Sequence, residues 1–162
     1  MPPAPTTPGR ILALDVGERR IGLALSDPLG LTAQGLPTLQ RQNRHTDLDA
    51  LAALARQHHV RLWLLGLPRH LSGDEGRQAV HVRRWGAALS RHSRLPVEFW
   101  DERLTTVEAH RVLRSASSTL AQTRRAIDRL SAVILLQSYL DAQALASLRP
   151  PDPVDSGPDR PL

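Results

Sequence analysis

The first 41 residues alternate between apolar runs and turn-forming residues in a way that predicts three β-strands. Arg10–Val16 contains four consecutive apolar residues, which is typical of a strand buried on both faces. A tight turn is expected at Gly17–Arg19, so that Arg20–Ser26 can pair with the first strand as a hairpin. Gly35–Arg41 forms a weaker third strand. The chain is therefore expected to begin as a β-meander.

Beyond residue 41 the pattern changes to helices that alternate with strands. Thr46 and Asp49 have the spacing of a capping box, which predicts the start of a helix. The final helix is too apolar over Ala132–Leu136 to lie on the surface. The expected elements are helix Thr46–His59, strand Arg61–Leu67, helix Arg77–His92, strand Leu95–Trp100, helix Thr105–Ser115 and helix Thr123–Leu148. This order predicts an α/β fold, with a mixed sheet and helices on its faces.

Length and composition limit the class of protein. The 162 residues fit one domain, expected over residues 10–148, between a disordered segment at 1–9 and a disordered Pro-rich tail at 149–162. The absence of cysteine excludes a disulfide framework, a cysteine zinc site and a thiol nucleophile. No apolar run is long enough to span a membrane, and the N-terminus lacks the apolar core of a signal peptide. We therefore expect a cytoplasmic protein without membrane contact.

The charge balance favours an anionic partner. The 21 basic residues are all arginine and face 16 acidic ones, and residues 150–162 carry −2, which leaves +7 on the rest of the chain. A GC-rich genome is an alternative explanation for the use of arginine in place of lysine, but it does not explain the net positive charge. Arginine binds phosphate in a bidentate manner, whereas the aromatic content of 3% disfavours recognition of single strands by base stacking. We expect a nucleic acid to be held mainly by its backbone.

Acidic residues stand at the ends of three otherwise apolar elements. They are Asp15 after the first strand, Asp101 and Glu102 after the fifth strand, and Asp128 near the start of the last helix. Functional groups of open α/β sheets gather at the carboxyl ends of strands. Converging carboxylates repel one another unless a cation lies between them, and hard oxygen ligands select Mg²⁺ or Mn²⁺. Together these acids predict a divalent-metal site.

Each acid also has a local explanation. Asp15 could accept hydrogen bonds from the turn amides that follow it, and Glu102 could pair with a neighbouring arginine. Asp128 could pair with Arg124 one helical turn earlier. These explanations are weaker for the group than for any single member, because they do not account for three acids at the edges of apolar elements.

Several short stretches around these acids resemble one known family. They are Leu14-Asp15-Val16-Gly17, Arg20-Ile21-Gly22-Leu23-Ala24, Ser26-Asp27, Gly66-Leu67-Pro68, Asp101-Glu102-Arg103-Leu104-Thr105-Thr106, Ile127-Asp128, and Ile134-Leu135-Leu136-Gln137-Ser138-Tyr139-Leu140-Asp141. The sequence is similar to the YqgF/RuvX family of RNase H-like nucleases from about Arg10 to Asp141. The stretch that begins at Asp101 is the most specific of them.

The resemblance implies an RNase H-like mixed five-stranded sheet, with the second strand antiparallel and helices on both faces. It also implies a metal site formed by Asp15, the acid after the fifth strand, and Asp128. We expect Glu102 rather than Asp101 as the second ligand, because side chains alternate at a strand end and only one of the two easily faces inward. Two Mg²⁺ or Mn²⁺ ions, bridged by Asp15, would then support in-line attack of water on a phosphodiester.

Arginines next to the acids are candidate phosphate-binding residues, although solvated surface or local ion pairs would explain them equally well. They are Arg19, Arg20, Arg103, Arg124 and Arg125. The loop Arg69–Gly76 departs from the family pattern: Leu71-Ser72-Gly73 replaces the Asp-Gly that family members often carry, and this loop is expected to contact the substrate. No histidine is needed as a base, and His70 in this loop is expected to be solvated.

Three classes of function are compatible with the sequence. The first is a metal-dependent nuclease, either processing the 5′ end of precursor 16S ribosomal RNA or resolving four-way (Holliday) DNA junctions, since the family is linked to both. The second is an ATPase of the actin and sugar-kinase type, which needs two such domains where this chain has one. The third is a catalytically silent nucleic-acid-binding scaffold. We favour single-stranded RNA and a monomer or weak homodimer, because no spare apolar patch for a permanent dimer is evident.

Overall fold

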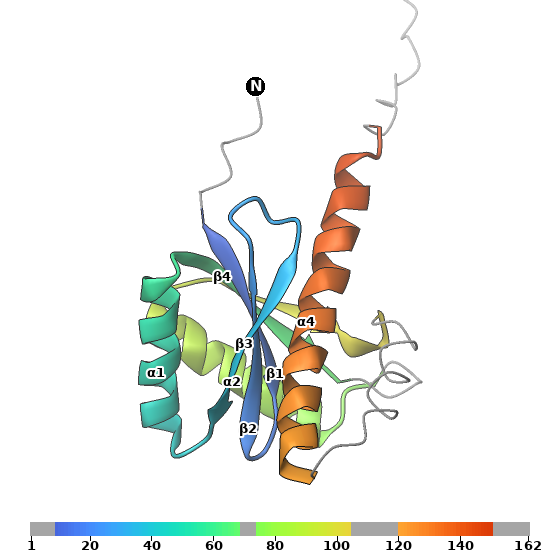
Figure 1. Ribbon diagram of the computed structural model, residues 1–162. Helices are drawn as coiled ribbons and strands as arrows, with labels where there is room; N and C mark the ends of the chain where they lie inside the picture. The colour runs from blue at the N-terminus through green and yellow to red at the C-terminus, as the bar shows by residue number, and fades with distance from the viewer. Residues whose placement is uncertain (1–8, 69–73, 105–119, 151–162) are drawn as a thin grey trace, which may run out of the picture.

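The computed structural model describes residues 9–68, 74–104 and 120–150, without the side chains of residues 120–124. Five strands form one sheet in the order β3-β2-β1-β4-β5 (Figure 1). They are β1 (Arg10–Val16), β2 (Arg20–Ser26), β3 (Ala33–Gln40), β4 (Val60–Leu67) and β5 (Val97–Asp101). β2 is antiparallel to both β1 and β3, whereas β4 is parallel to β1 and β5. The predicted mixed five-stranded sheet with an antiparallel second strand is confirmed.

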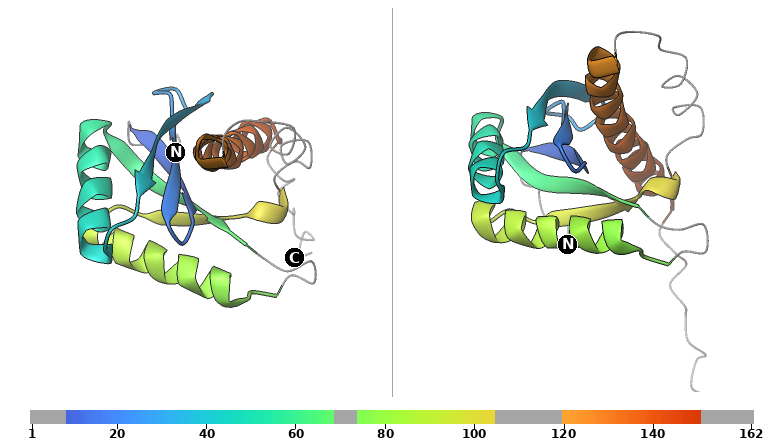
Figure 2. Two further views of the ribbon diagram at one scale, coloured as in Figure 1. Left: turned by 60° about the horizontal axis from the view of Figure 1, so that its bottom comes forward. Right: turned by 90° about the horizontal axis from the view of Figure 1, so that it is seen from below.

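Helices cover both faces of the sheet. They are α1 (Arg44–Gln57), α2 (Arg77–Ser93), the 3₁₀ turn η1 (Glu102–Leu104) and α4 (Leu120–Ser147). α1 and α2 pack together on one face, while α4 crosses the other face and extends beyond the sheet at its C-terminal end (Figures 1 and 2). None of the helices in the described part of the chain is long and apolar enough to cross a membrane.

The period-two alternation of the strands divides the core into two layers. On β1, Leu12, Leu14 and Val16 belong to the layer under α1 and α2. Ile11 and Ala13 belong to the layer under α4, together with Leu136 and Tyr139 of that helix. The residue that continues this second series is Asp15, so the same alternation that builds the core directs a carboxylate towards α4.

The first helix begins earlier than predicted. Asn43, not Thr46, is the N-cap: its side-chain oxygen accepts a hydrogen bond from the Thr46 amide at 2.9 Å. Thr46 therefore lies inside α1, and Asp49 is exposed beside His45 and His92 instead of closing a capping box. Asparagine is among the best N-cap residues, and it caps α1 here without an acidic residue three positions later.

Smaller differences concern strand and helix ends. The third strand is Ala33–Gln40 instead of Gly35–Arg41, the fourth begins at Val60, and the last helix begins at Leu120 instead of Thr123. The predicted helix at 105–115, most of the loop 69–76, and the terminal segments predicted as disordered lie outside the described residues, apart from Gly9 and residues 149–150.

Candidate active site

Asp15 lies at the carboxyl end of β1, in the centre of the sheet. Its neighbour in the pairing with β2 is Gly22. In the turn that follows, the Gly17 amide donates to the Arg20 carbonyl at 2.9 Å, so this amide does not serve the Asp15 carboxylate as the local explanation proposed. The Arg41 guanidinium donates to the Gly17 and Glu18 carbonyls at 2.8 and 3.1 Å and so braces this turn from the α1 side.

Gly22 sets the position of α4 over Asp15. A Cβ atom added to Gly22 would lie 2.2 Å from the backbone oxygen of Asp128. The helix backbone therefore rests directly on β2, an approach that no other residue type allows at this position. This contact brings the third acid, Asp128, to the strand next to Asp15.

Glu102 reaches the same region from the opposite side. It follows β5, and a Cβ atom added to Gly66 on β4 would lie 2.8 Å from its Oε1 atom. The Glu102 side chain thus extends over β4 into the space that a larger residue at position 66 would fill. The three acids come from three elements and meet around two glycines, Gly22 and Gly66, on the α4 face.

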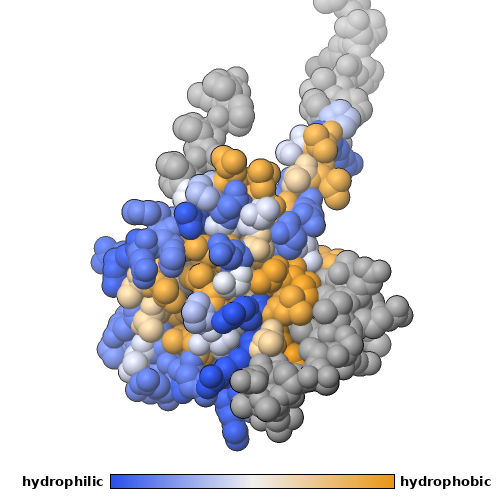
Figure 3. All heavy atoms as spheres, in the orientation of Figure 1, coloured by the Kyte–Doolittle hydropathy of each residue, from blue (hydrophilic) through white to orange (hydrophobic). Residues whose placement is uncertain are grey.

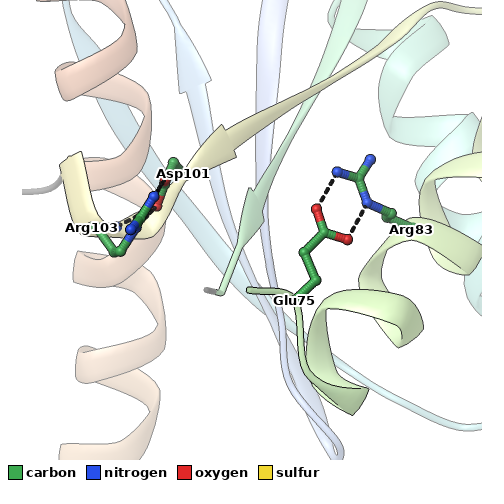
Figure 4. Close-up of polar contacts among 4 residues, drawn as sticks. All are labelled: Glu75, Arg83, Asp101 and Arg103. Atoms are coloured by element: carbon green, nitrogen blue, oxygen red, sulfur yellow. Dashed lines mark hydrogen bonds and ion pairs between the residues drawn. The ribbon is translucent and has the colours of Figure 1, made fainter. Parts of the chain in front are cut away.

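Asp101 points elsewhere. It pairs in register with Leu67, whose side chain lies in the layer under α1 and α2. Its carboxylate accepts hydrogen bonds from the backbone and guanidinium of Arg103, with Nη2–Oδ2 at 2.6 Å (Figure 4). This placement agrees with the preference for Glu102 over Asp101 as the acid that faces the site.

The electrostatics link the three carboxylates. Burial raises the pKa of Asp15 from 3.8 to about 6, with a further contribution from the negative charge of Asp128. Burial also raises the pKa of Glu102 from 4.5 to about 7, and the charges of Asp15 and then Asp101 add to this. The charge of Asp128 thus makes ionisation of Asp15 more costly, and the charge of Asp15 does the same for Glu102. A bound cation would lower both costs.

Arg20 provides the nearest positive charge. Its Nε atom lies 2.6 Å from Oδ2 of Asp128, and both side chains are about one-quarter exposed. Arg20 and Asp128 line an open polar depression of about 470 Å³ with Gly17, Glu18 and Arg19. Asp128 is therefore ion-paired in this structure with an arginine of β2, and the Arg124 side chain, the partner that the local explanation named, lies outside the described part of the structure.

The other predicted phosphate-binding arginines are dispersed. Arg19 is exposed on the β1–β2 turn and Arg125 is exposed on α4. Arg103 is engaged by Asp101, and the side chain of Arg124 lies outside the described part of the structure. Among the described side chains of this set, Arg19 and Arg20 line the same depression as Asp128.

Gly22, Gly66 and Arg41 were not singled out by sequence reasoning. The two glycines did carry a signal, because a glycine inside an otherwise apolar strand often marks a close backbone approach. Arg41 carried none: its partners are backbone carbonyls 23 and 24 residues away, which leave no trace in the sequence.

The donor set fits a hard divalent cation. All three groups are carboxylates, and their mutual repulsion favours a bound positive charge. As the side chains stand, no group of three or more His, Cys, Asp or Glu residues among those described could hold a metal ion. Enclosing an ion would therefore require side-chain rotation, including release of Asp128 from Arg20.

The raised pKa values predict that the metal-free protein loses stability as pH rises from about 4 to about 7. In this range the folded protein binds protons at Asp15 and Glu102 more tightly than the unfolded chain does, so the free energy of unfolding falls with pH. Full ionisation of Asp15 would cost up to about 3 kcal/mol. Thermal midpoints measured in EDTA across this range should fall more steeply for the wild type than for Asp15→Asn. Parallel curves would contradict the assignment.

The sequence is similar to that of a known protein family and of named bacterial proteins. Residues 9–142 match the sequence profile of the RuvX family, described as Holliday junction resolvase. A protein of Koribacter versatilis (strain Ellin345), named as a candidate pre-16S rRNA nuclease, is 50% identical over 137 residues, which is 85% of this chain and 90% of that protein. A protein of Myxococcus xanthus (strain DK1622) with the same name is 44% identical over 150 residues, covering 93% and 95%.

A solved structure shares the fold. RuvC of T. thermophilus, determined in complex with a Holliday junction substrate, superposes with a TM-score of 0.54 over 83% of this chain and 96% of that chain. The sequences are 8% identical, so the similarity concerns the arrangement of the sheet and helices.

Proposed function

The chain belongs to the RuvX family of nucleases, and we propose that it hydrolyses nucleic-acid phosphodiester bonds with divalent metal ions held by Asp15, Glu102 and Asp128. The observation that carries this proposal is the meeting of three carboxylates from β1, η1 and α4 around Gly22 and Gly66. Burial and the charges of neighbouring acids raise the pKa values of Asp15 and Glu102, and pKa values shifted in this way cluster at functional sites.

Each part of the site has a distinct role in this proposal. Two Mg²⁺ or Mn²⁺ ions would activate the attacking water and stabilise the leaving oxygen. Asp15, Glu102 and Asp128 would hold these ions through their carboxylate oxygens. Arg20 would exchange its contact with Asp128 for a substrate phosphate, and Arg19 would bind the same backbone from the turn.

We propose precursor 16S ribosomal RNA as the substrate, processed at its 5′ end. The names of the relatives from K. versatilis and M. xanthus support this choice. The proposal includes a cytoplasmic location, because ribosomal RNA precursors are made and processed there. A monomer or weak homodimer suffices for it, since a single site can cut a flexible strand.

Junction DNA is the second candidate substrate, favoured by the description of the family. A junction resolvase must cut two strands at symmetric positions and so needs a stable two-fold dimer.

Sedimentation at micromolar protein, run beside cleavage of single-stranded RNA and of a four-way junction with Mn²⁺, distinguishes the two substrates. We expect a monomer or weak dimer that cuts the RNA. A tight dimer that makes paired symmetric nicks in the junction and leaves the RNA intact would overturn the RNA assignment. Binding of either substrate without cleavage under any divalent ion would favour a silent scaffold.

Binding is expected to be dominated by phosphate contacts, because the chain is rich in arginine and poor in aromatic residues. The logarithm of the affinity should fall linearly with the logarithm of salt concentration, by about 0.7 per contact for single strands. Arg125→Ala should lower this slope by about that amount, while Arg56→Ala at the far end of α1 should not. An affinity independent of salt would contradict this expectation.

A further inference from the structure

A stripe of basic residues runs along the solvent face of α2, away from the carboxylates. Arg77, His81 and Arg84 are spaced by four and three residues, which places them on one face of the helix. They line an open depression of about 680 Å³ together with Val80, Gly76 and Glu75. None of the expected phosphate-binding residues belongs to this stripe.

Within the described residues, no ion pair forms at Arg77, His81 or Arg84. Glu75 is the acid that lines the depression, and its two carboxylate oxygens are engaged by the Arg83 guanidinium, with Arg83 Nε 2.7 Å from Oε2 (Figure 4). Arg83 in turn lies over the Phe99 ring at 5.0 Å, which fixes the pair against the sheet.

Two sets of contacts connect this stripe with the active site. In the first turn of α2, the side-chain Nε2 atom of Gln78 donates to the carbonyl oxygen of Val16, the residue after Asp15, at 3.4 Å. Further along α2, Arg41 and Arg44 both lie over the buried Trp85 ring, at 5.0 and 5.9 Å from its centre.

These two arginines form a bridge between the β1–β2 turn and α2. Arg41 binds the turn carbonyls of Gly17 and Glu18, and Arg44 donates to the Arg84 carbonyl at 3.1 Å. Arg44 is exposed and Arg41 is partly exposed. The side of the molecule formed by α1 and this turn is predominantly hydrophilic in the space-filling view (Figure 3). A series of arginines therefore leads from the depression beside Asp128 to the stripe on α2.

We propose that the nucleic-acid strand cut at the active site continues past the β1–β2 turn and is held by its phosphates along Arg77, His81 and Arg84. This inference rests on the proposed nuclease function and adds a second, more distant binding segment to it. Arg77 and Arg84 are about 10 Å apart along the helix axis, a distance that corresponds to about three nucleotides of a stacked strand. None of the residues that line the depression is Phe, Tyr or Trp, so we expect the contact to depend little on base sequence.

The test compares how tightly RNAs of two lengths bind under conditions that prevent cleavage. Single-stranded RNAs of about 8 and about 24 nucleotides are bound in EDTA at several salt concentrations, by the wild type and by the double variant Arg77→Ala, Arg84→Ala. We expect the variant to lose about tenfold in affinity for the longer RNA and about 1.4 in salt slope, because two phosphate contacts are removed. The shorter RNA should bind within about twofold of the wild type.

A matched control removes the same charge elsewhere. Arg56→Ala, Arg91→Ala deletes two exposed arginines near the C-terminal ends of α1 and α2, and should leave both lengths and the slope unchanged. Equal losses in the two double variants, or an unchanged slope in the first, would overturn the proposal.

The outcomes also separate this inference from the proposed function. A wild type that cleaves with Mn²⁺ while Arg77 and Arg84 prove dispensable would refute the α2 segment alone. A wild type that never cleaves, but shows the length-dependent loss, would refute the proposed nuclease chemistry and leave the binding segment standing.

Discussion

Asp15→Asn is expected to reduce Mn²⁺-dependent cleavage at least about a thousandfold, which corresponds to about 4 kcal/mol of lost transition-state stabilisation. Asp15 interacts with both other carboxylates: the charge of Asp128 raises the pKa of Asp15, and the charge of Asp15 raises the pKa of Glu102. Asparagine keeps the size of the side chain but supplies one neutral oxygen in place of a charged carboxylate. The measurement is single-turnover cleavage of RNA at saturating protein.

The same substitution should stabilise the metal-free protein. At pH 8 the wild type carries an ionised Asp15 whose pKa is raised by burial, and the neutral amide avoids that cost. An increase of up to about 3 kcal/mol would raise the thermal midpoint in EDTA by up to roughly 6–12 °C. Asp49→Asn, on the exposed face of α1, is the control and should leave both cleavage and midpoint unchanged. Loss of activity together with loss of stability would indicate a structural role for Asp15.

Gly22→Ala is expected to be the most disruptive single-methyl change in the described structure. The new Cβ would overlap the Asp128 backbone oxygen at 2.2 Å, and a helix backbone cannot rotate away as a side chain can. α4 must move, which we expect to cost about 3 kcal/mol or more and to lower the thermal midpoint by at least about 6 °C. Cleavage should fall with it, because Asp128 moves away from Asp15.

Gly66→Ala offers a contrasting case. The atom nearest to the added methyl group is the end of the flexible Glu102 side chain, at 2.8 Å. The fold should therefore tolerate the change at a cost of about 1 kcal/mol. Activity should fall much more than stability, because Glu102 is displaced from the site.

Gly30→Ala is the control for both glycine variants. It lies in an open loop with φ +70°, so it costs only backbone strain and should leave cleavage unchanged. If Gly22→Ala and Gly66→Ala lowered stability and activity in equal proportion, the roles assigned to the two glycines would be wrong.

The parts of the site that sequence reasoning located are those governed by local rules. Strand alternation places Asp15 on the α4 face and separates Asp101 from Glu102, and both consequences can be worked out from a few adjacent residues. The order of elements likewise determined the mixed sheet, because a hairpin followed by alternating helices and strands leaves few arrangements.

The features that were missed depend on contacts between distant residues. Arg20 pairs with Asp128, which is 108 residues away in the sequence. Helix periodicity suggested only a local partner for Asp128, Arg124 one turn earlier, and gave no signal for a partner on β2. The start of α1 was predicted three residues too late for a different reason: the capping-box pattern pointed to Thr46 and Asp49, whereas the Asn43 side chain caps the helix by itself.

The uneven burial of α4 also affects how motion spreads along it. Between Asp128 and the protruding end lies a packed segment that includes Ala132, Leu136 and Leu140, whereas residues 143–150 are all exposed. Hydrogen exchange should therefore be fast in the last turns and slow in the packed segment. Fraying that begins at the protruding end would stop before it reaches Asp128. This end of α4 is consequently the place where a fluorophore or a surface tether could be attached without disturbing the carboxylates.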